Sequence, residues 1–195
     1  MNKIIIASGN AGKLREIVRI LEPLNINAAP QSDFGVPECP EPYVTFIENC
    51  LAKARHASAH TGLPALADDS GICVDALNGA PGVYSARYAG EPKFDHRNNE
   101  KLLHAMHGIT DRRAHYYCVL VLVRHAEDPQ PLIAEGEWHG EIAHTERGEG
   151  GFGYDPLFWL PELGKMSAEL SRDEKAQISH RAQALKALLM KLALE

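Results

Sequence analysis

Two adjacent carboxylates, Asp68 and Asp69, end an apolar run that begins at Leu66. Anionic side chains at the end of a buried strand cost free energy unless a cation or hydrogen-bond donors meet them. We therefore expect a divalent metal ion and the chemistry of the protein at this point. Taken alone, Asp68 to Gly71 fit a simple turn better, because Asp, Ser and Gly all favour turns. The segments around them are what favour a site.

A turn from Ser8 to Lys13 joins an expected strand, Ile4–Ala7, to an expected helix that Pro23 ends. Free N–H groups at the start of a helix and the charge of Lys13 both suit a phosphate group. This is not a Walker loop, since no Ser or Thr follows Lys13 and the glycine spacing is too short. A plain connection between a strand and a helix is the alternative interpretation.

A capping box that begins at Thr45 predicts a helix that runs to about Gly62. Asn49 and Lys53 are four residues apart and share one face of it. That face is either solvated or directed into a polar cleft. Glu41 lies in the preceding loop, which is rich in Pro and Glu, and is either an exposed carboxylate or a metal ligand.

Two apolar runs, His115–Val123 and Pro131–Trp138, are separated by turn-forming residues and predict a β-hairpin. A hairpin that follows a strand–helix opening indicates a mixed sheet. The fold class expected from the residues is therefore α/β.

Four glycines between Gly148 and Gly153 surround an aromatic ring, a phenol and a carboxylate. Such a backbone can approach a flat ligand closely, with Phe152 stacking on a base and Asp155 accepting from its edge. A β-bulge or a loop of low order explains the glycines equally well.

Three cationic or donor side chains gather near the start of the last helix, after a capping box at Ser171–Glu174. Anions and the carbonyl groups of nucleotide bases both bind favourably at such a place. A solvated run of charges is the alternative. The three residues are Lys175, His180 and Arg181.

The composition limits the class of protein. A chain of 195 residues that is 45% hydrophobic can bury one good-sized core, as one domain or one domain with two lobes. A net charge of -6 argues against nucleic acid and anionic membranes as partners. The four cysteines form no Cys-x-x-Cys pair and suggest a reducing compartment. Because no apolar run suits a signal peptide or a membrane span, we expect a cytoplasmic protein.

Six motifs in order resemble the HAM1 family of inosine triphosphate pyrophosphatases, and in particular its bacterial dITP/XTP members. The resemblance covers essentially the whole chain, residues 1–195, as a single domain. Each motif is modest alone, but their order is specific. They are Ser-Gly-Asn-x-x-Lys from Ser8, Phe-x-Glu-Asn-x-x-x-Lys-Ala from Phe46, Ala-Asp-Asp-Ser-Gly from Ala67, Gly-Ala-Pro-Gly-x-x-Ser-Ala-Arg from Gly79, Gly-Gly-Phe-Gly-Tyr-Asp-Pro from Gly150, and Ser-His-Arg from Ser179.

The resemblance implies a role for each matching position. Asp69 is implied to be the catalytic carboxylate, and magnesium (Mg2+) is implied to be bound by Asp69, Glu41 and Asp68. Ser70 is implied to lie against the substrate. The implied phosphate ligands are Ser8, Gly9, Asn10, Ala11, Gly12, Lys13, Lys53 and Lys175. The implied base pocket consists of Phe152, Gly153, Tyr154, Asp155, His180 and Arg181.

The resemblance also implies the fold and the reaction. The fold is an elongated, twisted mixed β-sheet with helices on both sides and two lobes, with the nucleotide between the lobes, in a homodimer. The reaction is hydrolysis of dITP, ITP or XTP to the monophosphate and pyrophosphate. Two alternatives stay open: a Maf-type pyrophosphatase with another nucleotide preference, and a regulator that binds a nucleotide without cleaving it.

Overall fold

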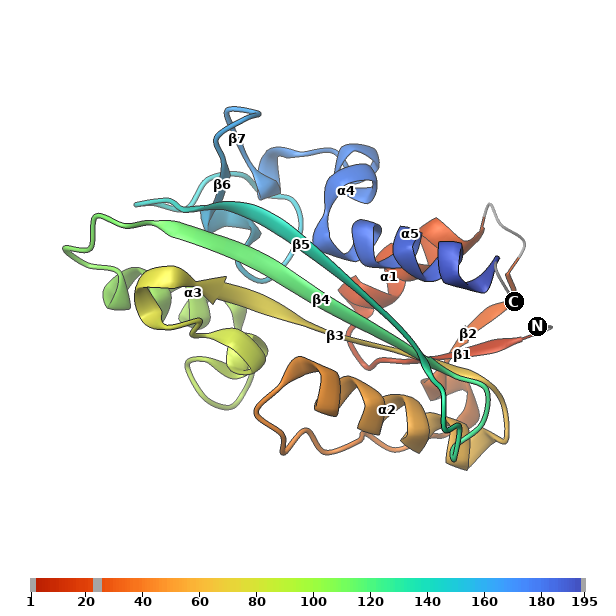
Figure 1. Cartoon of the computed structure of the whole chain (residues 1–195). Coiled ribbons are helices and arrows are strands. Elements are labelled where there is room, and N and C mark those ends of the chain that lie inside the picture. The colour runs from red at the N-terminus through yellow and green to blue at the C-terminus, as the bar shows by residue number, and fades with distance from the viewer. Residues whose placement is uncertain (1–2, 23–25, 194–195) are drawn as a thin grey trace. The chain divides into compact units, whose positions relative to one another are not determined.

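The described part of the chain, residues 3–22 and 26–193, has an α/β architecture with one seven-stranded sheet in a computed structural model (Figure 1). The strand order is β2-β1-β3-β4-β5-β6-β7. The strands are β1 (Ile4–Ala7), β2 (Ala28–Pro30), β3 (Ala65–Val74), β4 (Arg113–Val123), β5 (Leu132–Ile142), β6 (Phe158–Leu160) and β7 (Lys165–Met166). The helices are α1 (Ala11–Leu21), α2 (Phe46–Thr61), α3 (Asp95–Ala105), α4 (Arg172–Ile178) and α5 (His180–Leu192). Short 3-10 segments are η2 (Gln31–Phe34), η3 (Asp75–Leu77), η4 (Gly82–Arg87), η5 (Asp155–Leu157) and η6 (Ser167–Glu169).

The sheet contains both parallel and antiparallel pairs of strands. β1 is parallel to β2 and to β3, with Ala7 opposite Ala67. β6 is antiparallel to β5 and to β7. Residues 124–131 join the end of β4 to the start of β5. Where β5 ends, Ile142 N donates to Arg112 O, just before the start of β4, over 2.8 Å. The predicted mixed sheet and hairpin are therefore confirmed, although β5 continues beyond the predicted end at Trp138.

The chain folds as two compact units. The first unit consists of Met1–Asp69, Cys118–Gly136 and Arg181–Glu195, and the second of Ser70–Tyr117 and Glu137–His180. Strands β3, β4 and β5 each contribute residues to both units. Asp69 and Ser70, which are neighbours in β3, therefore belong to different units.

The core of the first unit follows the alternation of side chains in β1. Ile4 and Ile6 are buried in one cluster with Ile17 of α1 and Leu185 of α5. Successive side chains of a strand point to opposite faces of the sheet, so Ile5 lies on the other face, which α2 covers (Figure 1). Each of these side chains is almost fully buried and contributes about 1.5–3 kcal/mol. Helices therefore lie on both faces of the sheet in this unit.

The core of the second unit is aromatic. The rings of Tyr116 and Phe158 lie 4.7 Å apart in an edge-to-face arrangement, and Trp138 lies 5.4 Å from Phe158. Ile72 of β3 and Leu102 of α3 complete the same buried cluster. Edge-to-face pairs of rings stabilise a core beyond the area that they bury.

Two of the helices begin at the caps that the sequence predicted. Thr45 accepts from the backbone N–H of Glu48 at the start of α2. Ser171 and Glu174 form a reciprocal capping box at the start of α4. The expected stop at Pro23 lies outside the described residues. In the part of the chain that the structure describes, every helix is too short or too polar to cross a lipid bilayer.

Gly140 in β5 leads to the first testable prediction. An ideal Cβ there would lie 2.5 Å from Trp159 O and 2.8 Å from Phe158 Cζ. Alanine ordinarily suits a strand better than glycine does, but the backbone oxygen of β6 leaves no room for it. We expect Gly140→Ala to lower the free energy of unfolding by about 1–3 kcal/mol in a urea titration. The exposed neighbour His139→Ala should leave it nearly unchanged, and equal midpoints for the two variants would contradict the prediction.

Candidate active site

The candidate site in the first unit begins where β1 ends. Ala7 is opposite Ala67 in the parallel pair of β1 and β3, so Ser8 and Asp68 follow at the same level of the sheet. Ligands of open α/β sheets bind beyond the carboxyl ends of parallel strands, because helices start there with unpaired N–H groups. The fold therefore brings the predicted phosphate turn next to the predicted carboxylates.

Asn10 is the N-cap of α1. Its Oδ1 atom accepts from Gly12 N over 2.8 Å and from Lys13 N over 3.1 Å. Asn10 N in turn donates to the hydroxyl of Ser8 over 3.2 Å. The expectation that this turn presents free amides is therefore wrong for Gly12 and Lys13. The missed signal is the strong preference of Asn for the N-cap position.

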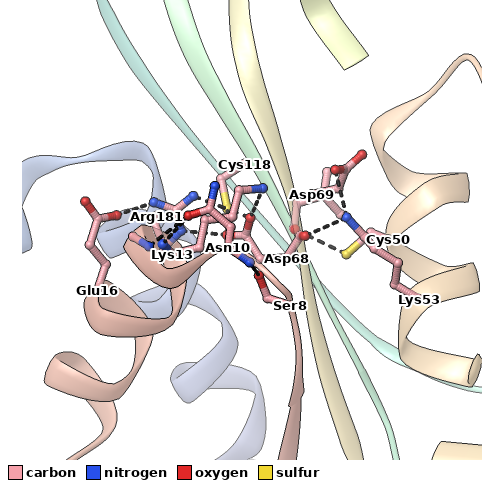
Figure 2. Close-up of polar contacts among 12 residues, drawn as sticks. Ser8, Asn10, Lys13, Glu16, Cys50, Lys53, Asp68, Asp69, Cys118 and Arg181 are labelled. Carbon is pink, nitrogen blue, oxygen red and sulfur yellow. Dashed lines mark hydrogen bonds and ion pairs between the residues drawn. The ribbon is translucent and has the colours of Figure 1, made fainter. Parts of the chain in front are cut away.

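Asp68 and Asp69 point to opposite faces of β3, as adjacent strand residues do (Figure 2). Asp68 is 1% exposed and lies on the side of α1 and α5. Its carboxylate accepts from Lys13 at 2.7 Å, from Arg181 Nε at 2.6 Å and from the thiol of Cys118 at 3.2 Å. Burial alone would raise the pKa of Asp68, but Arg181 and Lys13 hold it well below its usual range.

Arg181 is 1% exposed and lies between two carboxylates. Its Nε and Nη2 atoms donate to Asp68, and Nη1 donates to Glu16 on α1. Burial would lower the pKa of this guanidinium, but Asp68 and Glu16 raise it above its usual value. The resemblance placed Arg181 in a base pocket, whereas here its donors hold Asp68 and Glu16. Sequence reasoning missed Glu16 because its partner is distant in the chain.

Asp69 lies on the side of α2, where it shares a cation with Glu41. Lys53 Nζ is 2.9 Å from Asp69 Oδ1 and donates to the backbone oxygen of Asp68 at 2.8 Å (Figure 2). The same Nζ atom is 2.8 Å from Glu41 Oε1. Burial raises the pKa of Asp69, an effect that Lys53 and Lys13 only partly offset. Burial would lower the pKa of Lys53, but Asp69 and Glu41 raise it.

Asn49 fixes the loop that carries Glu41. Its Oδ1 accepts from Tyr43 N and its Nδ2 donates to Tyr43 O, both over 3.0 Å. Asn49 is buried on α2, one turn before Lys53. The spacing of Asn49 and Lys53 was therefore informative, but their roles differ: Lys53 contacts the carboxylates, whereas Asn49 orders the loop beside them.

The three carboxylates that were predicted to bind a metal ion, Asp69, Glu41 and Asp68, differ in how well their surroundings suit that role. No group of three or more His, Cys, Asp or Glu side chains is placed to hold a metal within residues 3–22 and 26–193. Magnesium, however, is commonly held by one or two carboxylates, with phosphates and waters as its other ligands. Asp69 and Glu41, drawn together by Lys53, suit that pattern. Asp68 suits it least, because both of its oxygens accept from the buried Arg181 and one also contacts Lys13.

A second group of predicted residues surrounds Asp155 in the second unit. Asp155 is 1% exposed, and its Oδ2 accepts from Lys175 Nζ at 2.5 Å and from Phe152 N at 2.9 Å. Its Oδ1 accepts from Ser167 at 2.9 Å and from the hydroxyl of Tyr116 at 3.4 Å. The carboxylate therefore organises the glycine-rich loop, a role that the composition of the loop alone did not predict.

Lys175 lies beside an aromatic ring of the same loop. Its Nζ atom is 4.9 Å from the centroid of the Phe152 ring. The resemblance placed Lys175 with the phosphate ligands, but in the structure it contacts Phe152 and Asp155. Gly151 permits this arrangement, since its φ is +77° and a Cβ there would lie 2.0 Å from Asp155 Oδ2.

Tyr154 and His180 complete this second group. The Tyr154 hydroxyl donates to Ser85 O over 2.8 Å in a buried position, and burial raises its pKa above the usual value. The His180 ring is nearly parallel to that of Tyr116, with 4.7 Å between centroids. The predicted residues thus fall into two groups. The first unit holds Ser8, Gly9, Asn10, Ala11, Gly12, Lys13, Glu41, Lys53, Asp68, Asp69 and Arg181, and the second holds Ser70, Phe152, Gly153, Tyr154, Asp155, Lys175 and His180.

The buried contacts of Asp68 lead to a second prediction. Asp68→Asn keeps the shape of the side chain but removes the negative charge between Arg181 and Lys13. We expect the free energy of unfolding to fall by about 3 kcal/mol, the scale of breaking a buried ion pair. The control is Asp111→Asn, which breaks an exposed pair with Arg113 at 2.7 Å and should have little effect. Similar losses for the two variants in denaturant titrations would contradict this account of Asp68.

Comparison with known proteins identifies the family. A model of the Ham1 family matches residues 4–191. A dITP/XTP pyrophosphatase of Nitrosomonas europaea is 65% identical over 193 residues, which are 99% of this chain and 95% of that protein. One of Chromobacterium violaceum is 62% identical, with 98% and 97% covered. Of the solved structures, a HAM1 protein from Coxiella burnetii has a TM-score of 0.93 at 48% identity with both chains fully covered, and the Staphylococcus aureus Ham1 protein has a TM-score of 0.88 at 41% identity with 98% of each covered.

The match extends over nearly every described residue and includes both groups of candidate site residues. The α/β fold that the sequence implied is confirmed by these structures. The chain belongs to the Ham1 family.

Proposed function

We propose that this chain is a hydrolase that cleaves non-canonical purine nucleoside triphosphates, dITP, ITP and XTP, into the monophosphate and pyrophosphate. Its relatives that are named dITP/XTP pyrophosphatases support this substrate class, because they are 58–65% identical over nearly the whole chain. The observation that carries the chemistry is the split of Asp68 and Asp69 between two faces of β3. Asp68 holds cations, and Asp69 lies beside Lys53 and Glu41.

The phosphates are assigned to the first unit. Lys13 and Lys53 offset the negative charge of a triphosphate and of the pyrophosphate that leaves. Asp68 holds Lys13 through a contact of 2.7 Å, so this ammonium group is in place before a ligand arrives. The turn from Ser8 to Lys13 lies at the same end of the sheet, where the start of α1 favours an anion.

Magnesium is the metal that we propose, with Asp69 and Glu41 as its protein ligands. When bound, the ion supplies charge to the phosphate oxygens and polarises the α-phosphorus. Lys53 keeps the two carboxylates together by lying within 3 Å of both, and so offsets the repulsion between them. Asp68 is assigned no metal contact, because its role is to hold Lys13 and Arg181.

Asp69 is the carboxylate assigned to the attacking water. The water oxygen forms a bond to the α-phosphorus, its proton passes to Asp69, and the bond between the α-phosphorus and the bridging oxygen breaks. The electron pair of that bond leaves with pyrophosphate. Burial favours this role because Asp69 is shielded from bulk water and its orientation is fixed by Lys53 at 2.9 Å.

The base is assigned to the second unit. Phe152 offers a ring for stacking, and Lys175 and His180 supply hydrogen-bond donors that suit a carbonyl at purine position 6. Asp155 orients Lys175 at 2.5 Å. This assignment moves Lys175 from the phosphates to the base and moves Arg181 away from the base. The homodimer and the cytoplasmic location stay predictions.

The third prediction tests the reaction and its specificity together. We expect pyrophosphate, and not orthophosphate with a diphosphate, as the direct product from ITP, XTP and dITP when magnesium is present. ATP has an amino group at position 6, which would leave buried donors unpaired, and rejection of up to roughly 10⁴-fold is attainable in such a pocket. Ion chromatography of the products and kcat/KM for ITP, XTP, ATP and GTP decide the matter. Orthophosphate release would contradict the reaction, and equal kcat/KM values for ITP and ATP would contradict the base assignment.

The fourth prediction concerns Asp69→Asn, which keeps the shape of the side chain and removes its charge. We expect kcat for ITP to fall by at least ~100-fold, as for the loss of an acid–base or metal-positioning group. The control is Asp75→Asn, which alters a carboxylate that directly follows the same strand and should leave kcat within about twofold. Circular dichroism would verify that both variants fold. Near-normal turnover of Asp69→Asn at saturating magnesium would contradict the assignment.

A further inference from the structure

The start of α3 holds Gly153 of the glycine-rich loop through both of its backbone polar groups. Gly153 N donates to Asp95 Oδ2 over 2.7 Å, and Asn99 Nδ2 donates to Gly153 O over 3.2 Å. Asp95 and Asn99 are four residues apart and therefore share one face of the helix. All three residues belong to the second unit.

Hydrogen bonds, and not crowding, fix the backbone of Gly153. Gly153 has a φ of +63°, a conformation that residues with a side chain rarely adopt, and a Cβ there would meet nothing within 4 Å. The backbone at Gly153 thus has room to turn, and glycine gives it the freedom to do so. The two contacts from α3 are what hold its N–H and C=O in one direction.

The neighbours of Gly153 are held by other parts of the second unit. Phe152 N donates to Asp155, and the hydroxyl of Tyr154 donates to Ser85 O. The backbone of Phe152 is thus held on its N-terminal side by Asp155 and on its C-terminal side by the contacts of Gly153 with α3. Its orientation depends on both.

Asn99 shows a feature that stability alone does not explain. The side chain is 3% exposed, yet its Oδ1 atom has no hydrogen-bond partner among the described residues. An unpaired buried acceptor costs stability, and such groups are rare in folded proteins. This unpaired acceptor lies beside the loop that carries Phe152.

We infer that Asp95 and Asn99 are positioning residues for base recognition, which act through the backbone of Gly153 on the orientation of Phe152. They strengthen binding of the purine base and leave the chemical step at Asp69 unchanged. Their benefit is preorganisation, since a loop that is already ordered loses less entropy when the base binds. The inference rests on the proposed function, in which Phe152 stacks on the base.

The test separates binding of the base from binding of the phosphates. Asp95 is exposed, so Asp95→Ala removes the acceptor of Gly153 N without leaving a cavity. We expect KM for ITP to rise about 10-fold, the effect of losing one hydrogen bond to a charged group, with kcat within about twofold. Calorimetry should show inosine monophosphate bound about 10-fold more weakly and pyrophosphate bound within about twofold of the wild type.

Three further variants make the result specific. Asp95→Asn keeps an oxygen that can accept from Gly153 N and should restore most of the affinity for inosine monophosphate. Glu100→Ala, which alters a carboxylate of α3 that pairs with His96 at 3.4 Å, should change nothing. Asn99→Ala should weaken binding of inosine monophosphate in the same direction as Asp95→Ala, in protein whose folding is verified by thermal melting.

The inference is overturned if Asp95→Ala leaves KM and the affinity for inosine monophosphate unchanged, or if it weakens binding of pyrophosphate equally. A fall in kcat at constant KM would also overturn it. Failure of the proposed function is a different result, because the wild-type chain would then release no pyrophosphate from ITP.

Discussion

The burial of the Asp68 carboxylate is the constraint on which the first unit depends. A carboxylate that is 1% exposed is tolerated only beside positive charge, and Lys13 of α1 and Arg181 of α5 supply it. Glu16 compensates the second cation. The four charges balance and tie β3 to two helices that are distant in the sequence. Lys13, at the phosphate turn, is thereby held in a fixed place.

The geometry of a β-strand gives the two adjacent carboxylates different surroundings. Side chains alternate between faces, so Asp68 meets Lys13 and Arg181 on one side while Asp69 meets Lys53 and Glu41 on the other. Their pKa values accordingly move in opposite directions, down for Asp68 and up for Asp69. Two carboxylates with divergent environments can serve divergent roles, one structural and one chemical. A single strand thus links the stability of the fold to the candidate site.

Local patterns predicted the parts of this arrangement that depend on neighbours in the chain. The strand–turn–helix at the start, the caps at Thr45 and Ser171 and the hairpin are all set by residues close in sequence. The partners of Arg181 and Lys175 were not predictable in this way, because the contact between Arg181 and Asp68 spans 113 residues and that between Lys175 and Asp155 spans 20. Motif resemblance placed both residues near a ligand but could not say which carboxylate each one meets. Only the packing of distant segments decides that.

The glycine-rich loop shows why flexible residues can form a rigid element. Glycine gives residues 150–153 access to left-handed backbone at Gly151 and Gly153, and this freedom alone would favour disorder. Order comes from buried partners outside that stretch, chiefly Asp155, which accepts from Phe152 N and from Lys175. Asp155 itself accepts from Ser167 and from Tyr116 of the aromatic core, so these contacts connect the loop to that core and hold it in place. Selectivity between bases that differ by one substituent requires such rigidity, since a loop that adapts to each base would pair its donors with either one.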